Sequence, residues 1–81
     1  DAGRRNELPR SVRSVLTPRE QQVLELMIGD FNNTEMAEKL SIAERTVRNY
    51  VSLIYDKLMV QSRFELMRFV RETQQRETES D

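Results

Sequence analysis

The 81-residue chain contains no cysteine and no histidine. Their absence removes disulfides, thiolate nucleophiles, imidazole bases and the usual zinc-ligand sets. No apolar stretch is long enough to span a membrane, and no segment resembles a signal peptide. The two glycines form no glycine-rich loop that could hold a phosphate. We therefore expect no cofactor, no metal ion and no membrane partner, and we place the protein in the cytoplasm.

The chain also lacks a large excess of positive charge, since its formal net charge is −1. Domains that bind nucleic acid are often strongly basic, so this value argues against such a partner. The charges are unevenly distributed, however. Residues 43–63 carry four basic and two acidic side chains, whereas residues 17–42 carry two basic and five acidic ones. Because the local field near a contact surface governs phosphate binding, a nucleic-acid partner stays open.

The length allows one small domain with a modest helical core. Residues 1–16 contain Gly3 and Pro9 and no sustained apolar period, so we expect a linker or N-terminal arm there. The chain starts at Asp1 rather than at a methionine, and we expect a partner domain upstream. The last residues, 72–81, are polar and charged, which predicts a disordered tail. The folded domain is then expected over residues 17–71.

Capping signals and apolar spacing predict the first two helices of this domain. Thr17 and Glu20 have the spacing of a capping box, and Pro18 suits the first helical position. That helix should bury Val23, Leu24, Met27 and Ile28 and should stop at Gly29 or Asp30. The segment Asn32-Asn33-Thr34 supplies cap chemistry for a second, short helix. This short helix should turn inward the residues Met36, Ala37 and Leu40.

A third helix is predicted over residues 44–58, directly after a short Leu-Ser-Ile turn. Its apolar side chains recur at helical spacing and should face the core: Val47, Tyr50, Val51, Ile54 and Leu58. Its opposite side carries Arg45, Arg48, Asn49 and Ser52. Arginine can donate two hydrogen bonds to guanine and asparagine can pair with adenine, so this face suits DNA bases. The small side chain of Ala37 allows the second and third predicted helices to cross closely. Together these two helices predict a helix-turn-helix.

A last helix should begin at the second capping-box pattern, Ser62 to Glu65. Its apolar residues, which include Leu66, are too many for one face of about 100°. One stripe can join the core, and Leu66, Met67 and Val70 suit it. A second apolar surface then remains for self-association. We assign to this dimer surface Phe64, Met67, Phe69 and Val70.

Residues Leu16 to about Val70 closely resemble the LuxR-type (FixJ/NarL-type) DNA-binding domain of bacterial transcription regulators. The resemblance rests on the order and spacing of several motifs: L-T-P-R-E followed by V-L-E-L, then N-x-E-M-A-E-K-L, E-R-T-V-R-N-Y, I-Y-D-K-L and V-Q-S-R-F-E. It implies an all-α, four-helix bundle-like domain that contains a helix-turn-helix. It also implies an upstream domain that receives a phosphate or a small ligand, dimerisation through the last helix, and RNA polymerase as a further partner.

The resemblance also implies roles for individual residues. Base-reading positions fall at Arg48, Asn49 and Ser52, with Arg45 beside them. Phosphate contacts fall at Thr34, Thr46, Tyr50 and Lys57. The implied function is sequence-specific binding of double-stranded DNA by a two-fold dimer, without catalysis.

Four positions depart from the family's pattern. Ala43 stands where a serine N-cap is usual, which removes a bond worth about 1 kcal/mol from the start of the third helix. Thr34 replaces a common lysine and Tyr50 a frequent histidine. Met59 replaces a glycine or asparagine at a point where a left-handed backbone is often needed.

Other functions stay open at this stage. The promoter-recognising region of a sigma factor shares the T-V-R pattern, although S-R-F-E at the start of a last helix disfavours it. A protein-interaction module with the same fold would explain the acidic net charge, Ala43 and Thr34. An enzyme is not expected, because the chain shows no clustered pair of acid–base residues.

Overall fold

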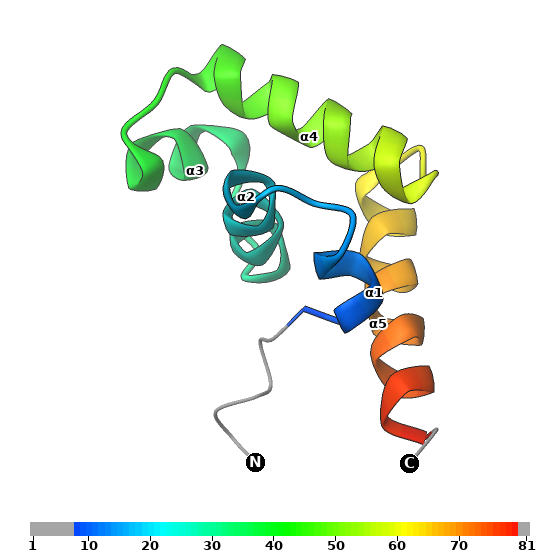
Figure 1. Cartoon of the computed structure of the whole chain (residues 1–81). Coiled ribbons are helices and arrows are strands. Elements are labelled where there is room, and N and C mark those ends of the chain that lie inside the picture. Colours follow the sequence, from blue (N-terminus) through cyan, green and yellow to red (C-terminus); the bar gives the residue numbers. More distant parts are fainter. Residues whose placement is uncertain (1–7, 80–81) are drawn as a thin grey trace.

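The computed structural model describes residues 8–79, with side chains up to residue 77. This part of the chain is all helical (Figure 1), as the sequence predicts. The sequence predicts four helices, and the structure adds a short one ahead of them. The five are α1 (Arg10–Arg13), α2 (Pro18–Ile28), α3 (Asn33–Leu40), α4 (Glu44–Leu58) and α5 (Arg63–Glu79).

Helix α2 begins at the predicted capping box. The Thr17 hydroxyl accepts from the Glu20 backbone N–H at 3.2 Å, and the Glu20 carboxylate accepts from the Thr17 backbone N–H at 2.9 Å. At the other end, Gly29 caps the helix with φ −76°, and the left-handed residue of the turn is Asp30, with φ 73°. Helix α2 therefore stops where the sequence predicts.

Helices α3 and α4 form the predicted pair. Asn32 caps α3 in a reciprocal capping box with Glu35. A three-residue turn follows, in which left-handed Ser41, at φ 57°, reverses the chain. Helix α4 then lies across α2 and α3 and contacts both (Figure 1). Ala37 is 8% exposed, which agrees with the role of a small residue where α3 meets α4.

The core lies between α4, α3 and α2 and continues along α5. All the predicted inward residues of the first three predicted helices are buried or half-buried. Fully buried side chains come from every helix, and the largest are Leu24, Met27, Met36, Ile54, Leu66, Val12, Val23 and Val47. Burial of apolar surface contributes about 25 cal/mol per Å² removed from water, so packing in this shared core is the main interaction that holds α4 in place.

Residues 8–16 do not form the predicted arm. Leu8, Val12 and Leu16 are 3%, 1% and 6% exposed, and α1 packs against α5. The three residues are spaced four apart, as on one side of a helix, although Leu8 precedes α1 and Leu16 follows it. The part of the predicted arm from residue 1 to residue 7 lies outside the described residues.

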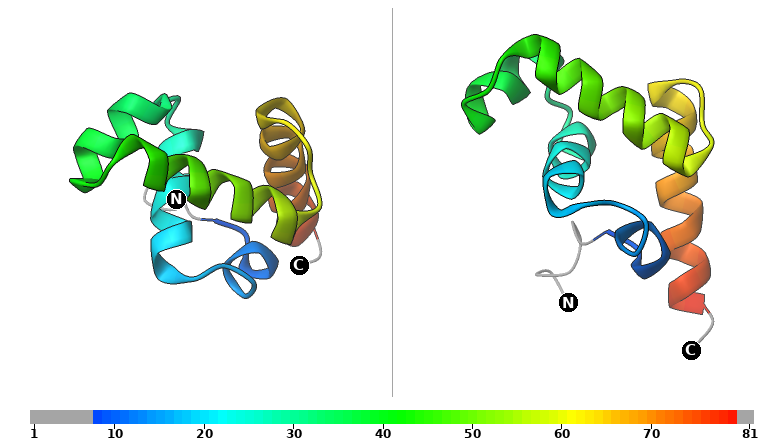
Figure 2. Two further views of the ribbon diagram at one scale, coloured as in Figure 1. Left: turned by 90° about the horizontal axis from the view of Figure 1, so that it is seen from above. Right: turned by 45° about the horizontal axis from the view of Figure 1, so that its top comes forward.

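Helix α5 also extends further than predicted, because it runs through the expected tail to Glu79. Its last turns pack beside α1 (Figures 1 and 2), and Glu77 accepts hydrogen bonds from the backbone N–H groups of Arg10 and Ser11 at 2.9 and 3.1 Å. These bonds hold the pKa of Glu77 below its usual value. Only one of the two hydrogen bonds of the capping box predicted at Ser62 is present. Ser62 accepts from the Glu65 N–H, but Glu65 accepts from the Gln61 N–H instead of that of Ser62.

Candidate nucleic-acid interface

The exposed side of α4 carries all four predicted base-reading residues. Arg45, Arg48, Asn49 and Ser52 are exposed, whereas Val47 and Ile54 on the other side are 0% exposed. Figure 2 shows that α4 lies along the outside of the molecule with one side clear of the other helices. The structure thus presents these four side chains together on one open helical face.

The first turn of α4 contains a network that joins it to α3. The Glu44 carboxylate accepts from the Arg48 guanidinium at 3.0 Å through Oε1 and from the Thr34 hydroxyl at 2.7 Å through Oε2. Ala43 provides no side-chain cap, as its residue type predicts. The first backbone N–H groups of α4 are therefore left without a side-chain partner from the N-cap, at the positive end of the helix dipole.

The four predicted phosphate-binding residues occupy different environments. Thr34 is exposed in the first turn of α3, but its hydroxyl hydrogen points to Glu44. Thr46 and Tyr50 are half-buried on α4, and the Tyr50 ring packs against the core. Lys57 lies in the last turn of α4, and its Nζ forms an ion pair with Glu20 Oε1 at 2.8 Å. Thr34 would therefore have to release its bond to Glu44 to donate to a phosphate, whereas Lys57 keeps two further N–H donors beside its ion pair.

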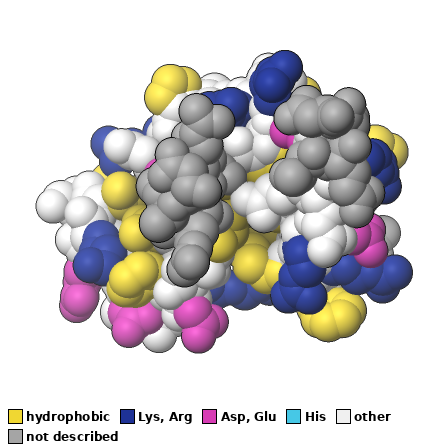
Figure 3. All heavy atoms as spheres, turned by 90° about the horizontal axis from the view of Figure 1, so that it is seen from below, with side chains coloured by type: hydrophobic (Ala, Val, Ile, Leu, Met, Phe, Trp, Pro, Cys, Tyr) yellow, Lys and Arg dark blue, Asp and Glu magenta, His cyan; other side chains and the backbone are white. Residues whose placement is uncertain are grey.

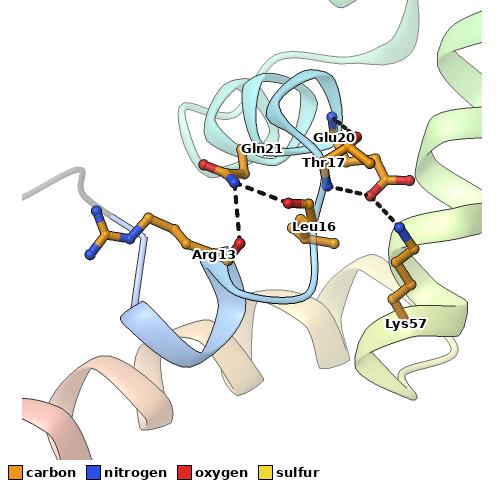
Figure 4. Close-up of polar contacts among 6 residues, drawn as sticks. All are labelled: Arg13, Leu16, Thr17, Glu20, Gln21 and Lys57. Atoms are coloured by element: carbon orange, nitrogen blue, oxygen red, sulfur yellow. Dashed lines mark hydrogen bonds and ion pairs between the residues drawn. The ribbon is translucent and has the colours of Figure 1, made fainter.

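Glu20 has a second role beyond the predicted cap. Its side chain is only 4% exposed, and Figure 4 shows Lys57 reaching from α4 to it. Burial raises the pKa of Glu20, but the hydrogen bond from Lys57 and those from Thr17 outweigh it, so the pKa lies below its usual value. The ion pair therefore ties the C-terminal end of α4 to the start of α2.

Gln21 fastens the segment before α2 in the same region. Its Nε2 donates to the carbonyl oxygens of Leu16 and Arg13 at 3.1 and 3.2 Å (Figure 4). Helix α2 therefore contacts both neighbours: Glu20 binds Lys57 of α4, and Gln21 binds Arg13 of α1.

The four residues predicted for a dimer surface do not share one exposed face. Phe64 is 73% exposed, Met67 and Phe69 are half-buried against the core, and Val70 is 3% exposed. Val70 packs inside the monomer, which agrees with its predicted place in the core stripe, so it adds no exposed area to the predicted dimer surface. Figure 3 views the end of the molecule away from α4, where apolar, basic and acidic side chains are intermixed.

Sequence reasoning missed the contacts of Glu44 and the ion pair of Glu20. Glu44 and Arg48 are four residues apart, so their pairing on one side of a helix had a visible signal. The contact of Glu44 with Thr34 and that of Glu20 with Lys57 join different helices, and local spacing gives no signal for them.

The described residues contain no group of three or more acidic, histidine or cysteine side chains placed to hold a metal ion. Among the same residues, no helix has both the length and the apolar character needed to cross a bilayer.

The short α3, the three-residue turn and the exposed polar face of α4 define the class of the protein as a helix-turn-helix domain. The family described as "GerE: Bacterial regulatory proteins, luxR family" matches residues 14–70. The chain belongs to this family, and it is a helix-turn-helix domain of DNA-binding transcription regulators.

Three relatives illustrate the similarity. The transcriptional regulatory protein DesR of Bacillus subtilis (strain 168) is 52% identical over 50 residues, which cover 62% of this chain and 25% of DesR. The response regulator Rre1 of Synechocystis sp. is 41% identical over 61 residues, which cover 75% of this chain and 26% of Rre1. The spore germination protein GerE of B. subtilis is 45% identical over 49 residues, which cover 60% of this chain and 66% of GerE.

The chain therefore spans about a quarter of the length of DesR and Rre1 and about two thirds of that of GerE. No solved structure gives a significant match.

Proposed function

We propose that this domain binds double-stranded DNA in a sequence-specific manner, with the N-terminal part of α4 in the major groove. The observation that carries the proposal is the open face of α4, on which Arg45, Arg48, Asn49 and Ser52 are exposed together. The helix is about 22 Å long at 1.5 Å per residue, and the major groove accepts a helix of this kind. Asp56 lies one turn beyond Ser52 and is exposed, so its negative charge favours contact through the earlier turns.

In this proposal, Arg48 donates to guanine and Asn49 pairs with adenine, while Arg45 and Ser52 lie beside them on the base edges. Thr46, Tyr50 and Lys57 contact the phosphates, and Thr34 can do so only by releasing its hydrogen bond to Glu44. Of these, Thr46 and Tyr50 border the exposed face of α4 without a competing ion pair. Helix α3 supports α4, and DNA binding by positioned helices needs no chemical step.

The regulator is proposed to act in the cytoplasm as a two-fold dimer on an inverted repeat. Phe64, which is 73% exposed, provides the apolar part of an α5 pairing surface, and the half-buried Met67 and Phe69 can add only their exposed parts to it. The relatives named as a response regulator and as transcriptional regulators are about four times longer than the matched segment. An upstream receiver or ligand-binding domain, and RNA polymerase as a partner at the promoter, complete the proposal.

The test is selection of bound sequences from a random duplex pool, followed by salt titration on the enriched sites and on bulk DNA. Enrichment of a repeated half-site, with a steep loss of affinity as salt rises, is the expected result. Arg48→Ala should cost about 1–3 kcal/mol at one base pair and relax the preference there. Tyr50→Phe should instead weaken all sequences alike, by about 1 kcal/mol, because it removes only a hydroxyl.

Lys57→Ala is not a clean test of a phosphate contact, because the substitution also leaves the buried carboxylate of Glu20 without its ion pair. Equal losses on enriched and random DNA for both Arg48→Ala and Tyr50→Phe would contradict the proposed roles. If the domain binds no duplex at low salt but forms dimers in the same solution, a protein-interaction module becomes the better explanation.

A further inference from the structure

The Glu44 carboxylate uses its two oxygens for two different helices. Oε1 accepts from Arg48 Nη1 at 3.0 Å within α4, and Oε2 accepts from the Thr34 hydroxyl of α3 at 2.7 Å. The three side chains form a chain of contacts from the supporting helix to an arginine of the exposed face. The Glu44 and Arg48 side chains remain 44% and 57% exposed, so DNA can approach them.

An exposed ion pair between residues i and i+4 would by itself order Arg48 only weakly. Here the carboxylate has a second anchor, and that anchor is rigid. Thr34 lies in the first turn of α3, which the reciprocal capping box of Asn32 and Glu35 fixes, and α3 is packed on α4. Glu44 is also the first residue of α4, where a negative charge interacts favourably with the helix dipole.

The contact leaves Arg48 able to bind a base. A guanidinium has five N–H donors, and Glu44 takes one of them. The remaining donors are enough for a bidentate contact with guanine O6 and N7. A side chain that is already ordered loses less conformational freedom on binding than a free one.

We infer that Glu44 is a positioning residue that sets the specificity of Arg48, and that Thr34 acts by holding Glu44 in place. This inference rests on the proposed DNA-binding function and assigns Thr34 a role different from a phosphate contact. The carboxylate holds the guanidinium over the open face of α4 before DNA arrives. Without it, Arg48 samples more orientations, including those that reach phosphates, which carry no sequence information.

The test compares selected sequences for the wild type, Arg48→Ala, Glu44→Ala, Glu44→Gln and Thr34→Val. The base pair at which Arg48→Ala loses its preference identifies the position read by Arg48. At that base pair, Glu44→Ala should reduce the preference by about three- to ten-fold, and Thr34→Val should produce a smaller loss at the same position. Preferences at other positions should not change.

Glu44→Gln should restore most of the preference. Its amide oxygen can accept from Arg48 while its amide nitrogen donates to Thr34, so it replaces both contacts without the charge. A role in helix stability alone would not give this pattern at a single base pair. Unfolding curves for all variants check that each one is folded. If Glu44→Ala does not fold, Thr34→Val supplies the test.

Glu72→Ala is the matched control. Arg68 and Glu72 form the same kind of exposed i,i+4 pair, at 3.2 Å, on α5, and its loss should leave the selected sequence unchanged. If Glu44→Ala and Thr34→Val select the wild-type base as strongly as the wild type does, the inference is overturned and the DNA-binding function stands. If the wild type itself enriches no sequence, the proposed function fails, and this inference fails with it.

Discussion

Ala43 and Met59 flank helix α4, and both are residue types that such positions disfavour. Ala43 is the N-cap, with φ −70° and ψ 148°, and it offers no side-chain oxygen. Met59 is the C-cap, with left-handed φ 60° and ψ 42°, a conformation that usually belongs to glycine or asparagine. The sequence indicated both weak points, because each is a purely local matter of residue type and backbone angle.

Ala43→Ser should stabilise the domain by about 1 kcal/mol, because the backbone at this position already has the extended conformation of an N-cap. The serine oxygen can accept from an N–H in the first turn of α4. Urea denaturation of the two proteins measures the difference. Ala43→Val is the control, since valine fills the site without an acceptor. A serine variant no more stable than the valine variant would show that water already satisfies these N–H groups.

Met59→Gly should raise the free energy of unfolding by about 0.5–1 kcal/mol. Glycine removes the steric cost of the left-handed backbone, although part of this gain is offset by the greater freedom of glycine in the unfolded chain. The Met59 side chain is 89% exposed, so little packing is lost. Met59→Ala, which keeps the strain and removes the side chain, should give no gain. A gain of equal size in the alanine variant would assign the effect to the side chain instead.

At the scale of elements, the ion pair between Glu20 and Lys57 joins α2 to α4. The folded-state pKa of Glu20 lies below its ordinary value of 4.5. The ionised carboxylate therefore stabilises the fold fully above pH about 4.5, and this contribution is lost as the pH falls through the lower, folded-state pKa. Acid should weaken the attachment of α4 before it affects the apolar core.

Lys57→Met should lower stability near pH 7 by about 1–3 kcal/mol, because it leaves a buried carboxylate without a charged partner. The difference from the wild type should narrow as the pH falls below about 4.5, since protonation removes the charge that Lys57 pairs with. Urea denaturation near pH 7 and again at a pH below about 4.5 measures the free energy of unfolding of both proteins. The same substitution in a Glu20→Gln background should cost much less. A cost that is equal at both pH values would mean that packing of the lysine stem, not the ion pair, stabilises the site.

The elements that the sequence predicted well are those whose signals are local. The capping boxes of α2 and α3 and the apolar spacing of α4 each involve residues within a few positions of one another, and all three appear in the structure. The bounds predicted for α4, residues 44–58, match those observed. The open polar face of α4 follows from the same spacing.

The elements that the sequence predicted poorly depend on contacts between distant parts of the chain. Helix α1 has only four residues and is too short to be stable alone, so its position depends on burial of Val12 and on Glu77, 66 residues after Ser11. The end of α5 is polar, and it is held by the same contacts from α1. Neither segment carries a strong local signal, and each depends on the other.

At the scale of the whole molecule, net charge and local charge point in opposite directions. The chain has a net charge of −1, while the first turns of α4 expose two basic side chains, Arg45 and Arg48, against one acidic side chain, Glu44. At physiological ionic strength, charges separated by more than about 8 Å are largely screened. Binding of phosphates should therefore follow the charge of this face and not the sum over the chain.

Two single substitutions separate these effects. Glu25→Gln raises the net charge from −1 to 0 on the exposed side of α2, while Arg45→Gln lowers it to −2 on the open face of α4. If net charge governed binding to random duplex DNA, the two variants would shift the affinity by similar amounts in opposite directions. We expect Glu25→Gln to leave both affinity and salt dependence nearly unchanged. Arg45→Gln should weaken binding and reduce its salt dependence, because it removes a positive charge from the open face.

The measurement is a salt titration of both variants and the wild type on the same random duplex, with unfolding curves as a check that the three are equally folded. Opposite shifts of equal size would show that the acidic remainder of the molecule acts on DNA over long range. A loss confined to Arg45→Gln would mean that a domain with a net negative charge can bind DNA because its fold separates the charges. Helix α4 presents basic side chains on its open side, and the acidic residues of α2 lie behind it.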